Sequence, residues 1–276
     1  MDSIPYYVIA FQLVPVALAL ANWLLSLYFA PKSNDFIADL KQLWPDSMPF
    51  LKTQWPFIAV CMLGSNLSQA QIISNGNVKT EFSFGIVIAS LVSAGILPIL
   101  KLFYVSYLAA PKYPGRVATI GIWSVLLYVM GDWFISTLGT LGLAFLVAPG
   151  LVILVRTCLF LPIYALEGHH PLAAVEKSWS LTAGHYWQIS RYLGLPTILF
   201  GILMLSPQVA TVIAATGHYP MQYSLPIVAA AGAASLALSM ILAGLTYKLY
   251  ERLSAADDTI LKDELTIKET IDIGAQ

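Results

Sequence analysis

Charge is the scarcest property of this sequence. Asp, Glu, Lys and Arg make up 11% of its 276 residues and 58% are hydrophobic, whereas soluble domains carry about 25% charged residues. Because so few polar side chains cannot cover a globular surface in water, the composition predicts a membrane protein. The 14 Lys and Arg residues, spread along a chain of net charge -1, exclude a nucleic-acid binder, which needs clustered cations.

Cysteine and recognisable catalytic motifs are also scarce. Cys61 and Cys158 lie inside apolar runs, where a thiol acts as a small hydrophobic group, and no CxxC spacing occurs. Glu and His residues gather in segment 167–185, but their spacing reproduces no known zinc site. No Ser/His pair, paired Asp or HExxH motif occurs at membrane depth. We therefore expect no enzyme, disulfide, metal or cofactor.

Long apolar runs are abundant. A spanning helix needs about 20 apolar residues, and no alternation typical of a membrane barrel repeats along the chain. The expected fold is an all-α polytopic helix bundle, a single domain over residues 1–250. The expected spans are 5–29, 55–73, 84–109, 117–147, 150–166, 192–214 and 224–249.

The first of these runs has two interpretations. It lacks the basic region of a secretory signal, although the stretch ALALAN carries small residues at cleavage-like spacing. We interpret residues 5–29 as a retained span, which gives seven helices. Six remain if this run is cleaved or lies in the membrane interface.

Lys and Arg in the short loops predict the orientation. Most of these residues fall on one side of the membrane, and the other side holds Lys79 alone if runs 117–147 and 150–166 form a hairpin. This asymmetry predicts a bacterial inner-membrane protein with its N-terminus outside and its C-terminus in the cytoplasm. The residues expected on the cytoplasmic side are Lys32, Lys41, Lys52, Lys112, Arg116, Lys177, Arg191, Lys248 and Arg252.

The expected hairpin contains two helix-breaking residues and one charged residue. Pro149 and Gly150 interrupt a long apolar stretch, which suits a tight turn between two helices. Arg156 follows about 9 Å below that apex. Its long side chain can reach the outer surface or the last carbonyls of helix 117–147. We therefore interpret Pro149, Gly150 and Arg156 as the anchor of the hairpin.

A short amphipathic segment follows the hairpin. Glu167 and the glycine after it end the apolar run, and Pro171 is a favourable first residue for a new helix. Gly184 can end that helix in a left-handed conformation. With Trp179 and Trp187 at headgroup level, we expect this segment to lie in the cytoplasmic interface.

The residues of this region resemble a known signature. The run PG-x5-R-x10-EG followed by AVEKSWSLTAG-x-x-W is similar to the glycerophosphoryl diester phosphodiesterase membrane-domain family and the YciC-like bacterial inner-membrane proteins. The resemblance implies a multi-helix integral membrane protein, sometimes fused to a phosphodiesterase domain that this chain lacks. The sequence departs from the family at Ala183, where a basic residue is frequent, and in its N-terminal helix. The matching positions are Pro149, Gly150, Arg156, Glu167, Gly168, Ser178, Trp179, Leu181, Thr182, Gly184 and Trp187.

Three polar residues inside the runs form a candidate intramembrane site. Lys101 and Asp132 lie about 25 and 22 Å from the outer ends of their helices and are thus nearly level. Asp132 is too short to reach the surface, so it either pairs with Lys101 or is protonated, and Lys101 can also reach the headgroups alone. Asn66 belongs to the polar run 55–73, which is packed inside the bundle or lines a wet crevice.

The end of the chain offers contacts for a partner. Ala229, Ala233 and Ala237 recur at four-residue spacing, a pattern of close helix packing in lipid. Small residues almost surround this last run, which favours a partner helix. Residues 251–276 carry seven acids and three bases, so we expect an acidic cytoplasmic tail that is disordered or docks a partner.

Two functions fit these features. The first is an accessory or scaffold subunit of a membrane assembly, without catalytic activity, whose partners are membrane lipids and a further membrane protein. The alternative is a transporter or lipid-handling protein. A wet cavity that reaches Asn66, Lys101 and Asp132 favours transport, whereas a dry core with an exposed small-residue face favours assembly.

Overall fold

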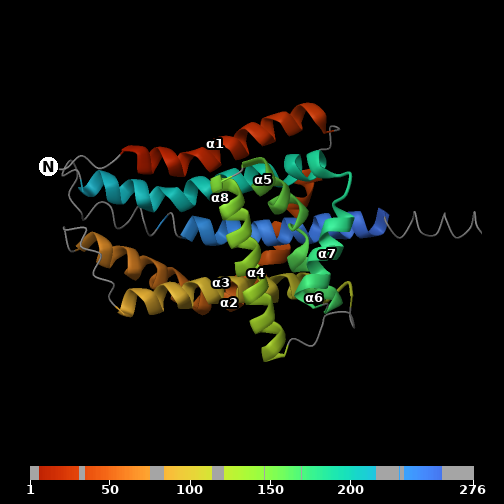
Figure 1. Ribbon diagram of the computed structural model, residues 1–276. Coiled ribbons are helices and arrows are strands. Elements are labelled where there is room, and N and C mark those ends of the chain that lie inside the picture. Colours follow the sequence, from red (N-terminus) through yellow and green to blue (C-terminus); the bar gives the residue numbers. More distant parts are fainter. Residues whose placement is uncertain are drawn as a thin grey trace, which may run out of the picture.

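The computed structural model is all-helical in its described part (Figure 1). The structure describes residues 6–30, 35–74, 84–113, 121–145, 147–168, 170–215, 230 and 233–256. Side chains are described over 16–30, 36–56, 95–113, 121–139, 141–142, 149–168, 170–203, 230 and 233–256. The predicted fold class is confirmed to this extent, since these residues form helices and turns and no strand.

The helices follow the predicted apolar runs closely. The run expected at 84–109 is a helix with those same bounds. A last helix over Ala233–Ala256, here named the C-terminal helix, covers most of the run expected at 224–249. The other bounds are α1 Tyr6–Phe29, α2 Asp35–Ser74, α3 Phe84–Ala109, α4 Ile122–Phe145, α5 Val147–Arg156, α6 Phe160–Glu167, α7 Pro171–Leu181 and α8 Tyr186–Ala215.

Helix α2 is longer than hydropathy predicted. It has 40 residues and begins at Asp35, whereas the apolar run begins at 55. Its first half buries Leu43 and Phe50 and exposes most of its polar residues, so this half is amphipathic and averages to a low hydropathy. Three prolines, which each remove one backbone hydrogen bond, lie inside the helix at 45, 49 and 56.

Within the part of the chain that the structure describes, three helices are long and apolar enough to cross a membrane by length and composition. They are Ile122–Gly139, Pro149–Glu167 and Ala233–Ala256, and Val16–Phe29 and Gly95–Ala109 are shorter apolar helices. These segments indicate a membrane protein, in agreement with the composition.

The long helices run along a common direction (Figure 1). α1 packs on α8, and α2 packs on α3. Their directions alternate, so that α1, α3 and the C-terminal helix end where α2 and α8 begin. We name this end the charged end, because Asp39, Lys112, Glu251 and Arg252 interact there.

The expected hairpin is formed by α4 and α5, but its turn and its direction differ from the prediction. The break lies between Phe145 and Val147, so Pro149 and Gly150 fall in the first turn of α5 and not at the apex. A methyl group on Gly142 would come within 2.7 Å of the Cα atom of Gly150, which shows how closely the two helices approach.

α4 crosses the direction of the other long helices in Figure 1. α5 packs against α4 on one side and against α8 on the other. Packing against neighbours sets the tilt of an apolar helix, and hydropathy carries no information about it.

Helix α6 is buried along almost its whole length. All residues from Phe160 to Leu166 are buried. The rings of Tyr128 and Phe160 stack with centroids 5.7 Å apart, and Tyr164 donates a hydrogen bond of 2.7 Å to the carbonyl of Ser124. These contacts hold α6 against α4.

The sequence predicts the end of α6 and the start of α7 but not the end of α7, whose last residue is Leu181 with Thr182 as its cap. Gly168 closes α6 with a left-handed φ of 63°, and its N–H bonds to the carbonyl of Tyr164. Pro171 opens α7, and Gly184 adopts a φ of 79° in the turn that leads to α8. Glycine adopts positive φ without the clash that a Cβ atom causes. Helix α7 packs on α6, and its hydroxyl groups contact the turn between α5 and α6.

Candidate functional site

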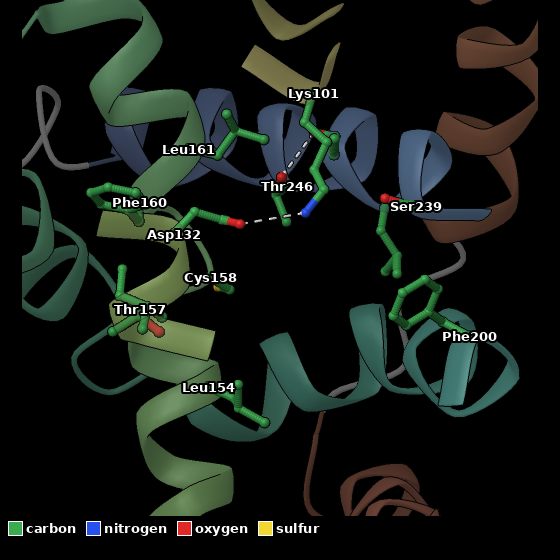
Figure 2. Close-up of a pocket in the computed structure, with 13 residues that line it drawn as sticks. Lys101, Asp132, Leu154, Thr157, Cys158, Phe160, Leu161, Phe200, Ser239 and Thr246 are labelled. Carbon is green, nitrogen blue, oxygen red and sulfur yellow. Dashed lines mark hydrogen bonds and ion pairs between the residues drawn. The ribbon is translucent and has the colours of Figure 1, made fainter. Parts of the chain in front are cut away.

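A cavity of about 210 Å³ lies between α3, α4, the α5–α6 turn, α8 and the C-terminal helix. Two of the predicted polar residues, Lys101 from α3 and Asp132 from α4, line it. Figure 2 shows these two side chains pointing toward each other across the cavity. The structure therefore brings together two charges that lie on different helices and at similar predicted depths.

The two charges form a loose pair. Lys101 Nζ lies 3.9 Å from Asp132 Oδ2, and the side chains are 23% and 22% exposed. This distance is longer than a hydrogen bond. The Tyr128 hydroxyl, one turn before Asp132, is buried and interacts with that carboxylate. Ammonium donors and carboxylate lone pairs thus face the cavity.

Two of the three hydroxyl groups in the cavity wall bond within their own segments. Thr157 Oγ1 donates to the carbonyl of Ile153 at 2.8 Å, and Thr246 Oγ1 donates to the carbonyl of Ala243 at 2.8 Å. The remaining wall is mostly apolar and includes the Phe160 ring. Lys101 and Asp132 are consequently the strongest polar groups that the cavity offers to a ligand.

A second cavity of about 210 Å³ lies beside the first, between α1, α5, α8 and the C-terminal helix. The two cavities share Leu154, Cys158, Leu242 and Thr246 in their walls. Most other wall residues of the second cavity are aliphatic, and the Oδ1 atom of its one amide side chain, Asn22, already accepts a hydrogen bond of 2.9 Å from Tyr186. The second cavity is therefore the apolar neighbour of a charged one.

The walls shared by both cavities depend on a break between α5 and α6. The backbone turns at Thr157–Leu159, and α7 supplies the missing hydrogen bonds. Ser178 Oγ donates to the carbonyl of Arg156 at 2.7 Å and accepts the N–H of Leu159 at 3.2 Å. Thr182 Oγ1 lies 3.4 Å from the same Arg156 carbonyl. Both hydroxyl residues are fully buried.

Arg156 has a different position from the one expected. It ends α5, donates a hydrogen bond of 3.3 Å to the Trp179 carbonyl and lies 5.7 Å from the centre of the Trp179 ring. Its partner is α7 and not the last carbonyls of α4. The last carbonyls of α4 were one of the two predicted partners and the outer surface was the other, whereas α5 ends at Arg156 and the side chain meets α7 there.

The segment expected at the membrane interface has one internal ion pair and two contacts with other helices. Glu167 accepts hydrogen bonds from Lys177 at 2.8 Å and from Tyr250 at 2.6 Å. Trp187 packs on Phe29, with ring centroids 5.0 Å apart. Trp179 is 44% exposed, as an interfacial position predicts.

The charged end contains a polar network that sequence reasoning missed. Arg252 contacts both carboxylate oxygens of Asp39 at 2.6 Å, and Tyr192 donates a further hydrogen bond to Asp39. The Asp39 side chain is almost fully buried. A signal was present in the sequence YKLYER at 247–252, where charges and tyrosines alternate at the end of an apolar run.

The same network ties the loop after α3 to the C-terminal helix. Lys112 Nζ lies 2.9 Å from Glu251 Oε1. This hydrogen bond raises the pKa of Lys112 above its ordinary value. At the other side of the charged end, burial raises the pKa of the Tyr186 hydroxyl. Both groups stabilise the ends of helices and lie away from the Lys101–Asp132 cavity.

The remaining candidate residues are only partly placed. The side chain of Asn66 and the whole of Ala229 lie outside the described residues, as does the expected acidic tail beyond 256. On the C-terminal helix Ala233 is half-buried and Ala237 is exposed. Within the described part of the chain, no three His, Cys, Asp or Glu side chains are grouped closely enough to hold a metal ion.

Comparison with known proteins adds no relative. The chain matches no protein-family model, and no match is found among the curated proteins or the solved structures.

Proposed function

We propose that this chain is a multi-pass bacterial inner-membrane protein that binds a lipid or solute, without catalysis, in the Lys101–Asp132 cavity. One observation carries this proposal. Two three-quarters-buried charges face a cavity and are 3.9 Å apart, too far for a hydrogen bond. Ionisable groups inside a membrane are costly and mark functional pathways or ligand sites.

The proposed topology has seven helices, with the N-terminus outside and the C-terminus in the cytoplasm. The alternating directions of α1, α2, α3, α8 and the C-terminal helix support it. α3 ends and α8 begins at the charged end, so the chain enters and leaves the α4–α5 hairpin on the same side of the bundle. The charge asymmetry predicted for the other helices is therefore kept, whatever the tilt of the hairpin. The charged end would then face the cytoplasm, as the positive-inside rule requires.

We also propose membership of the glycerophosphoryl diester phosphodiesterase membrane-domain family. The motif residues Ser178 and Thr182 support it, because they satisfy the broken backbone between α5 and α6. Because these residues have a structural role, the motif supports a shared fold and does not imply a shared reaction.

An accessory or scaffold subunit is the second candidate function. Ala234 and Ala237 are exposed on one part of the C-terminal helix, and small residues allow another helix to approach closely in lipid. The acidic tail would offer a second contact for such a partner. The exposed alanines favour this candidate independently of the cavity.

Gentle-detergent purification followed by mass spectrometry distinguishes the two candidates. We expect the wild-type chain to carry a defined lipid or solute, and Lys101→Met to lose it. Lys112→Met is the matched control, because it removes the same charge at the charged end and should retain the ligand. If the wild-type chain carries a stoichiometric protein partner and nothing small, the scaffold role replaces the proposed one.

A further inference from the structure

The two cavities divide the binding space into unlike halves. The first presents Lys101 and Asp132, and the second is lined mainly by aliphatic side chains such as Leu151 and Leu193. Leu242 and Cys158 belong to both walls. A molecule that fills both cavities therefore needs a charged part and an apolar part, which is the definition of an amphiphile.

The size of the space limits the apolar part. Ligand pockets usually have volumes of about 300–1,000 Å³. Each cavity of about 210 Å³ lies below that range, and the two reach it only when one ligand occupies both. At most one hydrocarbon chain can enter a cavity of this size, whereas the two chains of a bilayer phospholipid need a larger space.

The charges limit the head group. Lys101 offers only donors and attracts an anion, whereas Asp132 offers acceptors and repels one. The two groups are 3.9 Å apart, so any anion that reaches Lys101 also lies near Asp132. A simple carboxylate would meet that repulsion with nothing to offset it. A head group that carries a phosphate and an ammonium side by side satisfies both residues.

Resting on the proposed function, we infer that the ligand is a single-chain zwitterionic phospholipid. Its phosphate binds Lys101, its ammonium binds Asp132, and its acyl chain occupies the cavity between α1, α5 and α8. Between Lys101 and the end of α3 at Ala109 the helix rises about 12 Å. The head group is thus held inside the bundle, below the charged end, and is separated from the bilayer lipids.

The test measures binding of radiolabelled palmitoyl lysophosphatidylethanolamine to the full chain in nanodiscs of diacyl phosphatidylcholine. We expect saturable binding that unlabelled ligand displaces. Lys101→Met and Asp132→Asn should each weaken it by about tenfold, the effect of one lost charge-assisted hydrogen bond. Leu242→Trp, which fills the wall common to both cavities, should abolish it.

Matched variants control for misfolding. Lys112→Met removes a lysine outside the cavity, and Leu238→Trp adds the same bulk to the C-terminal helix at a half-buried position that lines neither cavity. Both should bind the probe as the wild type does. Equal loss in Leu238→Trp and Leu242→Trp would overturn the assignment of the acyl chain to the second cavity.

Competitors separate this inference from the proposed function. Free phosphoethanolamine, palmitate and dipalmitoyl phosphatidylethanolamine should all compete poorly. If phosphoethanolamine competes as well as the lysolipid, or if the two-chain lipid does, the single-chain inference is overturned while the cavity stays a ligand site. If no probe binds and Lys101→Met changes nothing that copurifies with the chain, the proposed function fails as well.

Discussion

Ser178→Ala tests the most unusual feature of the fold, the break between α5 and α6. The Ser178 hydroxyl is fully buried and is the one described partner of the Leu159 N–H. Its removal leaves that N–H without an acceptor. The Arg156 carbonyl also loses its shorter hydrogen bond, but Thr182 Oγ1 stays 3.4 Å away. The carbonyl is thus partly protected and the N–H is not.

The expected loss follows from these contacts. A buried donor left without a partner costs about 1–3 kcal/mol, and a lost hydrogen bond that is partly replaced costs about 0.5 kcal/mol. We therefore expect Ser178→Ala to lower the free energy of unfolding by about 2 kcal/mol. The amide of Leu159 should also exchange its hydrogen faster, because the substitution removes the hydrogen bond that protects that group and leaves α7 in place.

Reversible unfolding by dodecyl sulfate in mixed micelles, followed by circular dichroism, measures this free energy. Ser180→Ala is the matched control, since its hydroxyl is exposed and bonds only to the Lys177 carbonyl one turn earlier. It should change the free energy by less than about 0.5 kcal/mol. Equal losses in the two variants, or no faster exchange at Leu159, would refute the account of the break.

Three further substitutions probe the packing and the charges. Gly142→Ala forces a methyl group to within 2.7 Å of the Gly150 backbone, and should lower the melting temperature through a loss of about 1–3 kcal/mol. Asp39→Asn weakens the buried contacts to Arg252 and Tyr192 and should cost about 1–3 kcal/mol in the unfolding titration. In a double-mutant cycle, Asp132→Asn should destabilise the wild type more than it destabilises a Lys101→Met background, with a coupling of about 1 kcal/mol.

The first two substitutions each have a matched control in the same chain. Gly95→Ala, where the new methyl group meets no atom within 4 Å, should be neutral or stabilising because alanine favours a helix. Asp46→Asn alters an exposed carboxylate on the same helix as Asp39 and should have little effect. A stable Gly142→Ala protein, a harmless Asp39→Asn or a coupling of zero at Lys101 would each contradict the corresponding contact.

Local chemistry alone was enough to locate most helix ends. Gly168 and Gly184 adopt left-handed conformations and Pro171 opens a helix, because these residue types impose or allow those backbone angles wherever they occur. The bounds of α3 followed from hydropathy for a similar reason, since a change from apolar to polar composition is visible in one dimension. The amphipathic first half of α2 was not predicted, because the exposed polar neighbours of the buried Leu43 and Phe50 lower the mean hydropathy of this segment.

Only half of the candidate site could be predicted from the sequence. Lys101 and Asp132 stood out because a charge in an apolar run is rare, and equal predicted depth made them possible partners. The apolar second cavity and the network around Asp39 gave no such signal. Both arise from helices that are distant in the chain, and which face a helix turns toward another depends on how their side chains pack.

The sequence by itself determined that this protein is a bundle of apolar helices and which segments form them, because composition and backbone preference act residue by residue. Only the tertiary structure decided that α4 crosses the bundle, that Arg156 meets α7 and that two charges face one cavity. Close contacts such as that of Gly142 with Gly150 set those positions. They depend on the shape of both surfaces at once, and neither segment carries that information alone.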